Sequence, residues 1–164
     1  DFQFKDAIGR EWQLGTAQLD FQMPDRFDLE YTDKDGEKKT PVMIHRAVAG
    51  ALERFMALAI EHFAGAFPYW LSPVQVVVMP VNDDAHGEYA TQVFEKLLES
   101  GVRAEYSEAS ERLGKRMRNA KKQKTPYIFV LGDKEKESNT ITAEGRDDEK
   151  LEGISVVDFI NKTK

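Results

Sequence analysis

The chain has 164 residues, of which 23 are Lys or Arg, 29 are Asp or Glu and none is Cys. This length fits one domain, or one small domain with a part of another, and 41% hydrophobic residues suffice for a packed core. The lack of Cys excludes a disulfide scaffold, a thiolate nucleophile and a Cys-based zinc cluster, and it fits a reducing compartment. No apolar run approaches the ~20 residues that cross a bilayer, and the first residues do not resemble a signal peptide. The missing initiator Met hints at a longer parent protein.

The net charge of −6 hides a basic segment. Residues 112–124 carry seven positive charges and no negative one, so the remainder must sum to −13 (−6 minus +7). Concentrated positive charge on an otherwise acidic protein indicates an anionic partner. A solvated helix face that serves only solubility explains the same pattern, and this feature alone leaves both interpretations open.

The beginning of the chain predicts antiparallel strands. Residues 1–6 and 11–21 alternate between apolar and polar side chains, and the alternation slips at Gly15-Thr16, which indicates a β-bulge. Residues 28–32 and 41–44 flank an Asp-Lys-Asp-Gly turn, so a hairpin is expected there.

A helix is expected over residues 47–64. It is apolar on nearly all sides, which predicts a buried helix behind the sheet with further protein on its far side. Prolines and large aromatics follow, and we expect a domain boundary between residues 1–71 and 72–164. The first part therefore looks incomplete on its own.

The second part alternates between strands and helices, which predicts a small α/β domain with a largely parallel, mixed sheet. Ser155, with Asp158 three residues later, is expected to cap the last helix. The expected strands are residues 74–81, 102–106, 127–131 and an edge strand at 138–143, and the expected helices are 88–100, 110–122 and 156–161.

The sequence contains no phosphate-binding loop, nucleophile elbow or zincin motif. If the chain has a catalytic or binding site, we therefore expect it among the polar residues of the first part. Gln13 and Gln18 have opposite parity on a regular strand, and the expected bulge would bring them to one face; without it they are ordinary surface amides. His45 at the end of a short strand is either a metal ligand or a capping or core residue.

Arg54 lies on the apolar helix, nine residues after His45, so the two would project near opposite helical phases. They could still frame one elongated pocket. A guanidinium on a rigid helix suits binding of a phosphate or stacking on a base, while a buried ion pair with a Glu is the alternative.

Two runs carry a resemblance: Gly-Arg-Glu-Trp-Gln-Leu-Gly-Thr-Ala-Gln-Leu-Asp-Phe at residues 9–21 and Pro-Val-Met-Ile-His-Arg-Ala at residues 41–47. Both are similar to the threonyl-tRNA synthetases, and the second, extended to Phe55, is similar to motif 3 of class II aminoacyl-tRNA synthetases. The resemblance covers essentially the whole chain. It implies the end of an antiparallel class II catalytic domain followed by a class IIa anticodon-binding domain, in a cytoplasmic, homodimeric ligase.

The resemblance also implies roles for individual residues. His45 would be one of three zinc ligands, and that zinc would bind the amino and hydroxyl groups of threonine and so reject valine. Arg54 would be the motif 3 arginine that holds ATP, which enters with Mg²⁺. Gln13, Thr16 and Gln18 would line the pocket for threonine, adenylate and the terminal adenosine of tRNA, and Gly50 would let the adenine approach.

The other zinc ligands, the motif 2 arginine, the dimer element of motif 1 and any editing domain would precede Asp1. We therefore expect the isolated chain to be catalytically inactive, with no bound cofactor. A pyrophosphate-exchange signal from it would contradict this expectation.

The resemblance implies an anticodon-reading set with two departures from the family pattern. Glu135 matches a residue that contacts the anticodon, whereas Ser110 replaces an Asn and Glu144 replaces an Arg. Arg146 lies two residues after Glu144 and would face the same way, so either Arg146 substitutes or the contact is lost.

The basic helix would contact phosphates of tRNA(Thr) near the anticodon stem. Charge reversal at Arg116 and Lys121 is expected to weaken tRNA binding and flatten its salt dependence. The expected phosphate contacts are Arg112, Lys115, Arg116 and Lys121.

Two other interpretations compete with a ligase for threonine. One is a stand-alone, non-catalytic module that binds tRNA or protein, which the combination of Gln13, Gln18, His45 and Arg54 disfavours. The other is a class IIa ligase for another amino acid, which His45 in Ile-His-Arg-Ala disfavours.

Overall fold

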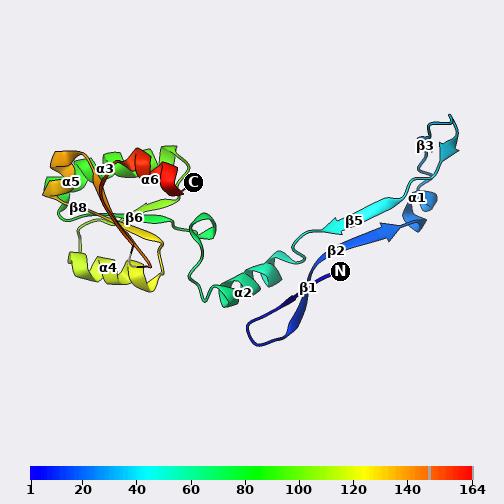
Figure 1. Ribbon diagram of the computed structural model, residues 1–164, viewed down its shortest axis with the longest axis horizontal. Helices are drawn as coiled ribbons and strands as arrows, with labels where there is room; N and C mark the ends of the chain where they lie inside the picture. Colours follow the sequence, from blue (N-terminus) through cyan, green and yellow to red (C-terminus); the bar gives the residue numbers. More distant parts are fainter. Residues whose placement is uncertain (148, 164) are drawn as a thin grey trace. The chain divides into compact units, whose positions relative to one another are not determined.

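The chain folds as two units, which divide between Gly65 and Ala66 (Figure 1). The computed structural model describes residues 1–147 and 149–163. The division comes earlier than the expected boundary at residue 71, because the segment after Gly65 is bonded into the second unit. The buried Ser72 hydroxyl donates to the carbonyls of Phe67 and Pro68, and Gln75 Nε2 donates to the carbonyl of Tyr69. Across the described part of the chain, no helix combines the length and the apolar character that a membrane span requires.

The first unit contains a three-stranded antiparallel sheet in the order β1-β2-β5. Its strands are β1 (Phe2–Lys5), β2 (Glu11–Asp20) and β5 (Met43–Ala47). Phe2 lies opposite Gly15 while Gln3 lies opposite Gln13, so Leu14 is an additional residue in β2. The expected bulge is therefore confirmed, one position earlier than the sequence indicated. One inserted residue changes the alternation, which places positions 13 and 18 on the same face of the strand.

The expected pairing of residues 28–32 with 41–44 is wrong. The hairpin closes earlier, between β3 (Tyr31–Thr32) and β4 (Lys38–Lys39), while β5 pairs with β2. The short helix α1 (Gln22–Arg26), which the sequence did not predict, follows β2 directly. Asp20 starts this helix, because its carboxylate accepts the backbone N–H groups of Gln22 and Met23.

Helix α2 spans Leu52–His62, shorter than the expected 47–64. Strand β5 extends to Ala47, and Gly50 has a φ of +66°, outside the helical region, so the helix begins only after it. The expectation of a buried helix is also wrong for this chain. Leu58 is its one buried side chain, whereas Leu52 and Ile60 are 65% and 51% exposed, because the described residues pack against only one side of it.

The second unit is built on a five-stranded mixed sheet in the order β10-β9-β8-β6-β7, which confirms the predicted α/β class. Strand β6 is parallel to both of its neighbours, β7 at the edge of the sheet and β8. Strand β9 runs antiparallel to β8, and β10 runs antiparallel to β9. The strands are β6 (Val76–Pro80), β7 (Ala104–Tyr106), β8 (Tyr127–Leu131), β9 (Ile141–Gly145) and β10 (Lys150–Ile154).

The position of β9 corrects the expectation of an edge strand at 138–143. Strand β10, which the sequence analysis missed, covers its outer edge. The segment of β10 is rich in charge and contains Gly153 at a φ of +66°, so its pattern does not indicate a strand.

Helices cover both faces of this sheet (Figure 1). One face packs its apolar side chains, including Phe129 and Val78, against Leu97 of α3 and Phe159 of α6. The other face packs Val77, Met79 and Ile128 against Ala120 of α4. The expected cap of α6 is confirmed by a hydrogen bond from the Asp158 N–H to Ser155 Oγ. The helices are α3 (Asp83–Glu99), α4 (Leu113–Lys122), α5 (Asp133–Ser138) and α6 (Val156–Thr163), with a 3-10 turn η1 at Tyr69–Leu71.

Candidate functional site

The first candidate site is an open depression of about 700 Å³ on the first unit, where β2 and β5 pair. Gln18 lies directly opposite His45 in the register, and both line the depression together with Asp20 and Phe21. His45 is on strand β5 and not on a helix, so the expected helical phase between it and Arg54 does not apply. The structure therefore brings Gln18 and His45 together.

Asp20 is the residue of this depression that the sequence analysis missed. Its Oδ2 lies 2.9 Å from His45 Nε2. Its pKa is lowered, mainly by the hydrogen bond from the Met23 N–H and next by the bond to His45. Asp20 follows Gln18 by two positions on a regular strand, and this spacing places both on one face.

Arg54 does not line the depression, and it forms no buried ion pair with any residue that the structure describes. Its guanidinium is exposed, donates to the backbone carbonyl of Gln13 at 3.0 Å and lies over the ring of Trp12, 5.7 Å from the centroid. Gln13 and Thr16 also lie outside the depression, and Thr16 Oγ1 donates to Asp1. The structure therefore groups Gln13 with Arg54 and Gln18 with His45.

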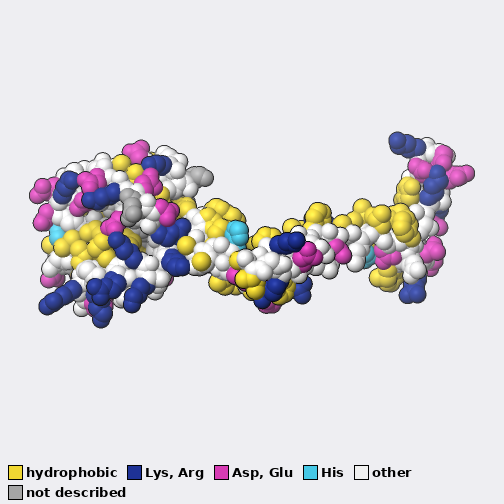
Figure 2. Space-filling model, turned by 60° about the horizontal axis from the view of Figure 1, so that its bottom comes forward, with side chains coloured by type: hydrophobic (Ala, Val, Ile, Leu, Met, Phe, Trp, Pro, Cys, Tyr) yellow, Lys and Arg dark blue, Asp and Glu magenta, His cyan; other side chains and the backbone are white. Residues whose placement is uncertain are grey.

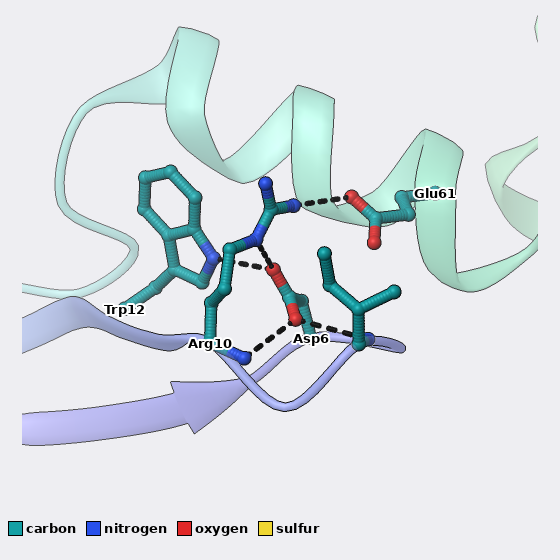
Figure 3. A network of polar contacts seen from close by, with 5 residues as sticks. Asp6, Arg10, Trp12 and Glu61 are labelled. Carbon is teal, nitrogen blue, oxygen red and sulfur yellow. Dashed lines mark hydrogen bonds and ion pairs between the residues drawn. The ribbon is translucent and has the colours of Figure 1, made fainter.

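Trp12 is held by a polar network around Asp6 (Figure 3). The Asp6 carboxylate is buried and accepts from Trp12 Nε1 at 2.9 Å, from the side chain of Arg10 and from the backbone N–H groups of Ile8 and Arg10. Arg10 in turn donates to Glu61 on α2. The network thus ties the β1–β2 turn to α2 and fixes the ring on which Arg54 rests.

Acid is expected to weaken the first unit through Asp6. Burial raises the pKa of Asp6, but the bonds from Trp12 and Arg10 outweigh it and lower this pKa from 3.8 to about 2. The carboxylate thus stabilises the fold above pH 4, and this contribution is lost as the pH falls toward 2. Urea unfolding monitored by Trp fluorescence should show less acid sensitivity in Asp6→Asn than in the wild type. Asp25→Asn, which removes an exposed carboxylate, should retain the wild-type sensitivity; an Asp6→Asn profile equal to the wild type would contradict the assignment.

Gly50 holds the chain close to β2. A Cβ at this position would lie 2.4 Å from the carbonyl oxygen of Leu14. The requirement for glycine therefore has a structural origin within the chain itself.

The second candidate site is the basic helix α4 with its flanking residues. Figure 2 shows Lys and Arg side chains gathered on the α4 side of the second unit. Arg118 and Lys122 are exposed on this helix, and Arg112 is exposed at its N-cap. Lys115 pairs with Glu111 at 2.5 Å, and Lys121 pairs with Glu144.

Arg116 contradicts its expected role as a phosphate contact. It is 5% exposed, and its guanidinium donates to the backbone carbonyls of Glu111, Ser107 and Pro80. Sequence reasoning counted it with its basic neighbours because charge alone does not distinguish the inner face of a helix from the outer one. Its i, i+4 spacing from the buried Ala120 was the available signal.

The expected anticodon-reading residues have structural partners. The Glu135 carboxylate accepts from Thr142 Oγ1 and from the Gly132 N–H in a capping box at α5. Burial raises its pKa, but these bonds leave the pKa below its usual value. Ser110 is exposed in the loop before α4.

Arg146 does not continue the strand of Glu144, because β9 ends at Gly145. Its guanidinium donates to the carbonyls of Phe67 and Lys124. The expectation that it faces the same way as Glu144 therefore fails, since alternation applies only within a strand.

Two family models match the chain. Residues 75–164 match the anticodon binding domain, and residues 1–63 match the tRNA synthetase class II core domain (G, H, P, S and T). The first match alone covers more than half of the chain.

The chain is similar to threonine–tRNA ligases along its whole length. It is 51% identical over 162 residues to those of Clostridium tetani (strain Massachusetts / E88) and Acetivibrio thermocellus, which covers 99% of the chain and 25% of each relative. The chain thus spans about a quarter of the length of the curated relatives it matches.

A solved structure resembles it closely as well. The RNA binding domain of threonyl-tRNA synthetase from Cryptosporidium parvum Iowa II is 34% identical, with a TM-score of 0.86 over 98% of this chain and 40% of that one. Prolyl-tRNA synthetase from the same organism shares the fold at 22% identity and a TM-score of 0.65. The chain therefore belongs to the class II aminoacyl-tRNA synthetases, as a segment of the class II core followed by an anticodon-binding domain of the threonine–tRNA ligase type.

Proposed function

We propose that this chain is part of a cytoplasmic, homodimeric threonine–tRNA ligase, which activates threonine with ATP and Mg²⁺ and transfers it to tRNA(Thr). The observation that carries this proposal is the identity of about half of the residues to threonine–tRNA ligases along the whole chain. In this ligase, residues 1–65 would contribute to the aminoacylation site, and residues 66–164 would bind the anticodon region of the tRNA.

In the aminoacylation site, Arg54 would bind ATP. Its guanidinium is exposed and is fixed by Trp12 and by the carbonyl of Gln13. Gln13, Thr16 and Gln18 would bind threonine, the adenylate and the terminal adenosine, next to the backbone turn at Gly50. The amide of Gln18 lines the same depression as His45, which supports their joint use for one substrate.

His45 would contribute one of three ligands to a zinc ion. Its side chain is 43% exposed, and the hydrogen bond that Nε2 donates to the Asp20 carboxylate leaves Nδ1 for a metal, in the way that outer carboxylates orient ligating histidines. No group of three His, Asp or Glu side chains in the described residues could hold a metal, so the other ligands would come from another segment. Such a zinc would coordinate the amino and hydroxyl groups of threonine.

In the second unit, the exposed cations of α4 and its N-cap would contact tRNA phosphates, while polar groups at the strand ends would read unstacked bases. Phosphate contacts supply affinity without sequence information, so the two roles can be separated by experiment. The proposed phosphate contacts are Arg112, Lys115, Arg118, Lys121 and Lys122, and the proposed base-reading residues are Ser110, Glu135 and Arg146.

A chimera tests the catalytic part of the proposal. The matching quarter of the Clostridium tetani ligase is replaced by this chain, and threonine-dependent pyrophosphate exchange and bound zinc are measured. We expect an active, zinc-containing protein. His45→Ala should lose both zinc and exchange, whereas His62→Ala, which alters the exposed imidazole at the end of α2, should retain zinc.

The same chimera distinguishes the alternative, a non-catalytic module that binds tRNA or protein. A chimera that folds and binds tRNA but shows no exchange would favour the module. Exchange with an amino acid other than threonine would favour a related ligase.

A further inference from the structure

Arg116 of α4 lies inside the second unit and holds two other segments of it. Its guanidinium donates from Nη2 to the carbonyl of Pro80 at 2.8 Å, from Nη1 to that of Ser107 at 2.9 Å and from Nε to that of Glu111 at 3.1 Å. These carbonyls belong to the last residue of β6 and to the loop between β7 and α4. No carboxylate of the described residues forms an ion pair with Arg116, so the buried charge is balanced by carbonyl dipoles.

Asp83 holds the same loop from the outside. It lies in the first turn of α3, and its Oδ2 accepts the N–H of Ala109 at 2.7 Å. Two carbonyls of the loop of residues 107–112 therefore accept hydrogen bonds from Arg116, and one N–H of the loop donates to Asp83. Its Ser107 N–H also donates to the carbonyl of Val78 on β6.

The place of this loop in the fold points to ligand binding. It follows the carboxyl end of β7, beside the carboxyl end of β6, and ligands of open α/β sheets bind at that edge. It also leads directly into the basic helix α4, and Ser110 and Arg112 are exposed on it. An RNA strand whose phosphates lie along α4 would bring its bases to this loop.

We propose that Arg116 and Asp83 are positioning residues, which hold loop 107–112 in the shape that reads an anticodon base. This inference rests on the proposed tRNA binding and deepens it. Neither side chain needs to contact the RNA. A loop that is ordered before binding loses less conformational entropy on association, and its polar groups stay within hydrogen-bond distance of one base. Arginine suits this role because its rigid, planar guanidinium spreads its donors over three nitrogen atoms, whereas a lysine ammonium has all its donors on one atom.

The decisive comparison is Asp83→Ala against Asp84→Ala. Both remove one carboxylate from the first turn of α3, but among the described residues only Asp83 of this pair accepts from the loop. The affinity of the chain is measured for the anticodon stem-loop of tRNA(Thr) and for a stem-loop with altered anticodon bases, at several salt concentrations. We expect Asp83→Ala to reduce the preference for the cognate stem-loop about tenfold, within the range of one lost base contact, with an unchanged salt slope. Asp84→Ala should keep the wild-type preference.

A second comparison addresses Arg116 itself. Arg116→Lys keeps the charge but not the fork, and it should also reduce the preference without changing the salt slope. Arg118→Ala, on the exposed face of α4, should lower the slope by about 1 and keep the preference. If circular dichroism shows that Arg116→Lys does not fold, the comparison of the Asp83 and Asp84 variants alone tests the positioning role.

The outcomes separate this inference from the function on which it rests. A wild-type preference that survives in Asp83→Ala would overturn the positioning role alone. Equal binding of both stem-loops by the wild type would overturn the proposed anticodon recognition, and the positioning role with it.

Discussion

Gly50→Ala is expected to destabilise the first unit by about 2–5 kcal/mol. The φ of +66° costs a residue with a Cβ about 1–2 kcal/mol, and the close approach adds a steric term of about 1–3 kcal/mol. The new Cβ would lie 2.4 Å from the Leu14 carbonyl oxygen, which is backbone and cannot rotate away. Relief of this contact would separate β2 from the turn that leads into α2, and so disturb the strand that carries Gln13 and Gln18.

The measurement uses Trp70→Phe as the background, so that Trp12 fluorescence reports the first unit. This background change is mild because Trp70 is 71% exposed. The control is Gly36→Ala, which has a φ of +84° with nothing within 4 Å of its Cβ position, and it should cost only the backbone term. Equal urea unfolding midpoints for the two variants would show that the close approach to Leu14 contributes nothing.

Phe159→Ala is expected to destabilise the second unit by about 3–5 kcal/mol. The Phe159 ring is completely buried and lies edge-on against the rings of Phe129 and Tyr127, with centroids 4.8 and 5.0 Å away. Its removal leaves a cavity between α6 and the sheet that these rigid aromatic neighbours cannot fill. Because a domain has only about 5–15 kcal/mol in total, α6 should detach in a large fraction of molecules.

Amide hydrogen exchange of β6 and β8 measures this loss, since these strands exchange only when the core opens. Val157→Ala is the matched control on the same helix, where a side chain that is 60% exposed should cost little. Protection of β8 in Phe159→Ala that equals the control would refute the assigned role of α6 in the core.

The elements of the second unit were predictable because its strands and helices follow simple periodicities. The buried run of β6 and the amphipathic face of α3 predicted the right order of elements from β6 to β8, whereas helix α5 and strand β10 were not predicted. The failures have local causes. Strand β10 is charged, and its neighbour β9 lies inside the sheet only because β10 covers it. In the first unit, the hairpin closes within β3 and β4, so residues 43–47 pair with β2 instead of with residues 28–32.

The sequence predicted which residues belong to the candidate sites, but it did not predict which of these residues lie next to one another. The pattern identified His45, Gln18 and Arg54 as residues with chemistry, yet it could not show that His45 faces Gln18 across two strands while Arg54 rests on Trp12. It also counted Arg116 among the phosphate contacts, although this side chain lies inside the unit.

The sequence by itself determined the class of the protein, the bulge in β2 and the basic segment of α4, because residue identity and spacing along one strand or helix are local properties. The tertiary structure decided what each polar group does. Whether a guanidinium meets a phosphate or a backbone carbonyl depends on which segments, distant in the chain, close around it. For Arg116 those segments are the end of β6 and the loop after β7, which only the packed sheet brings together.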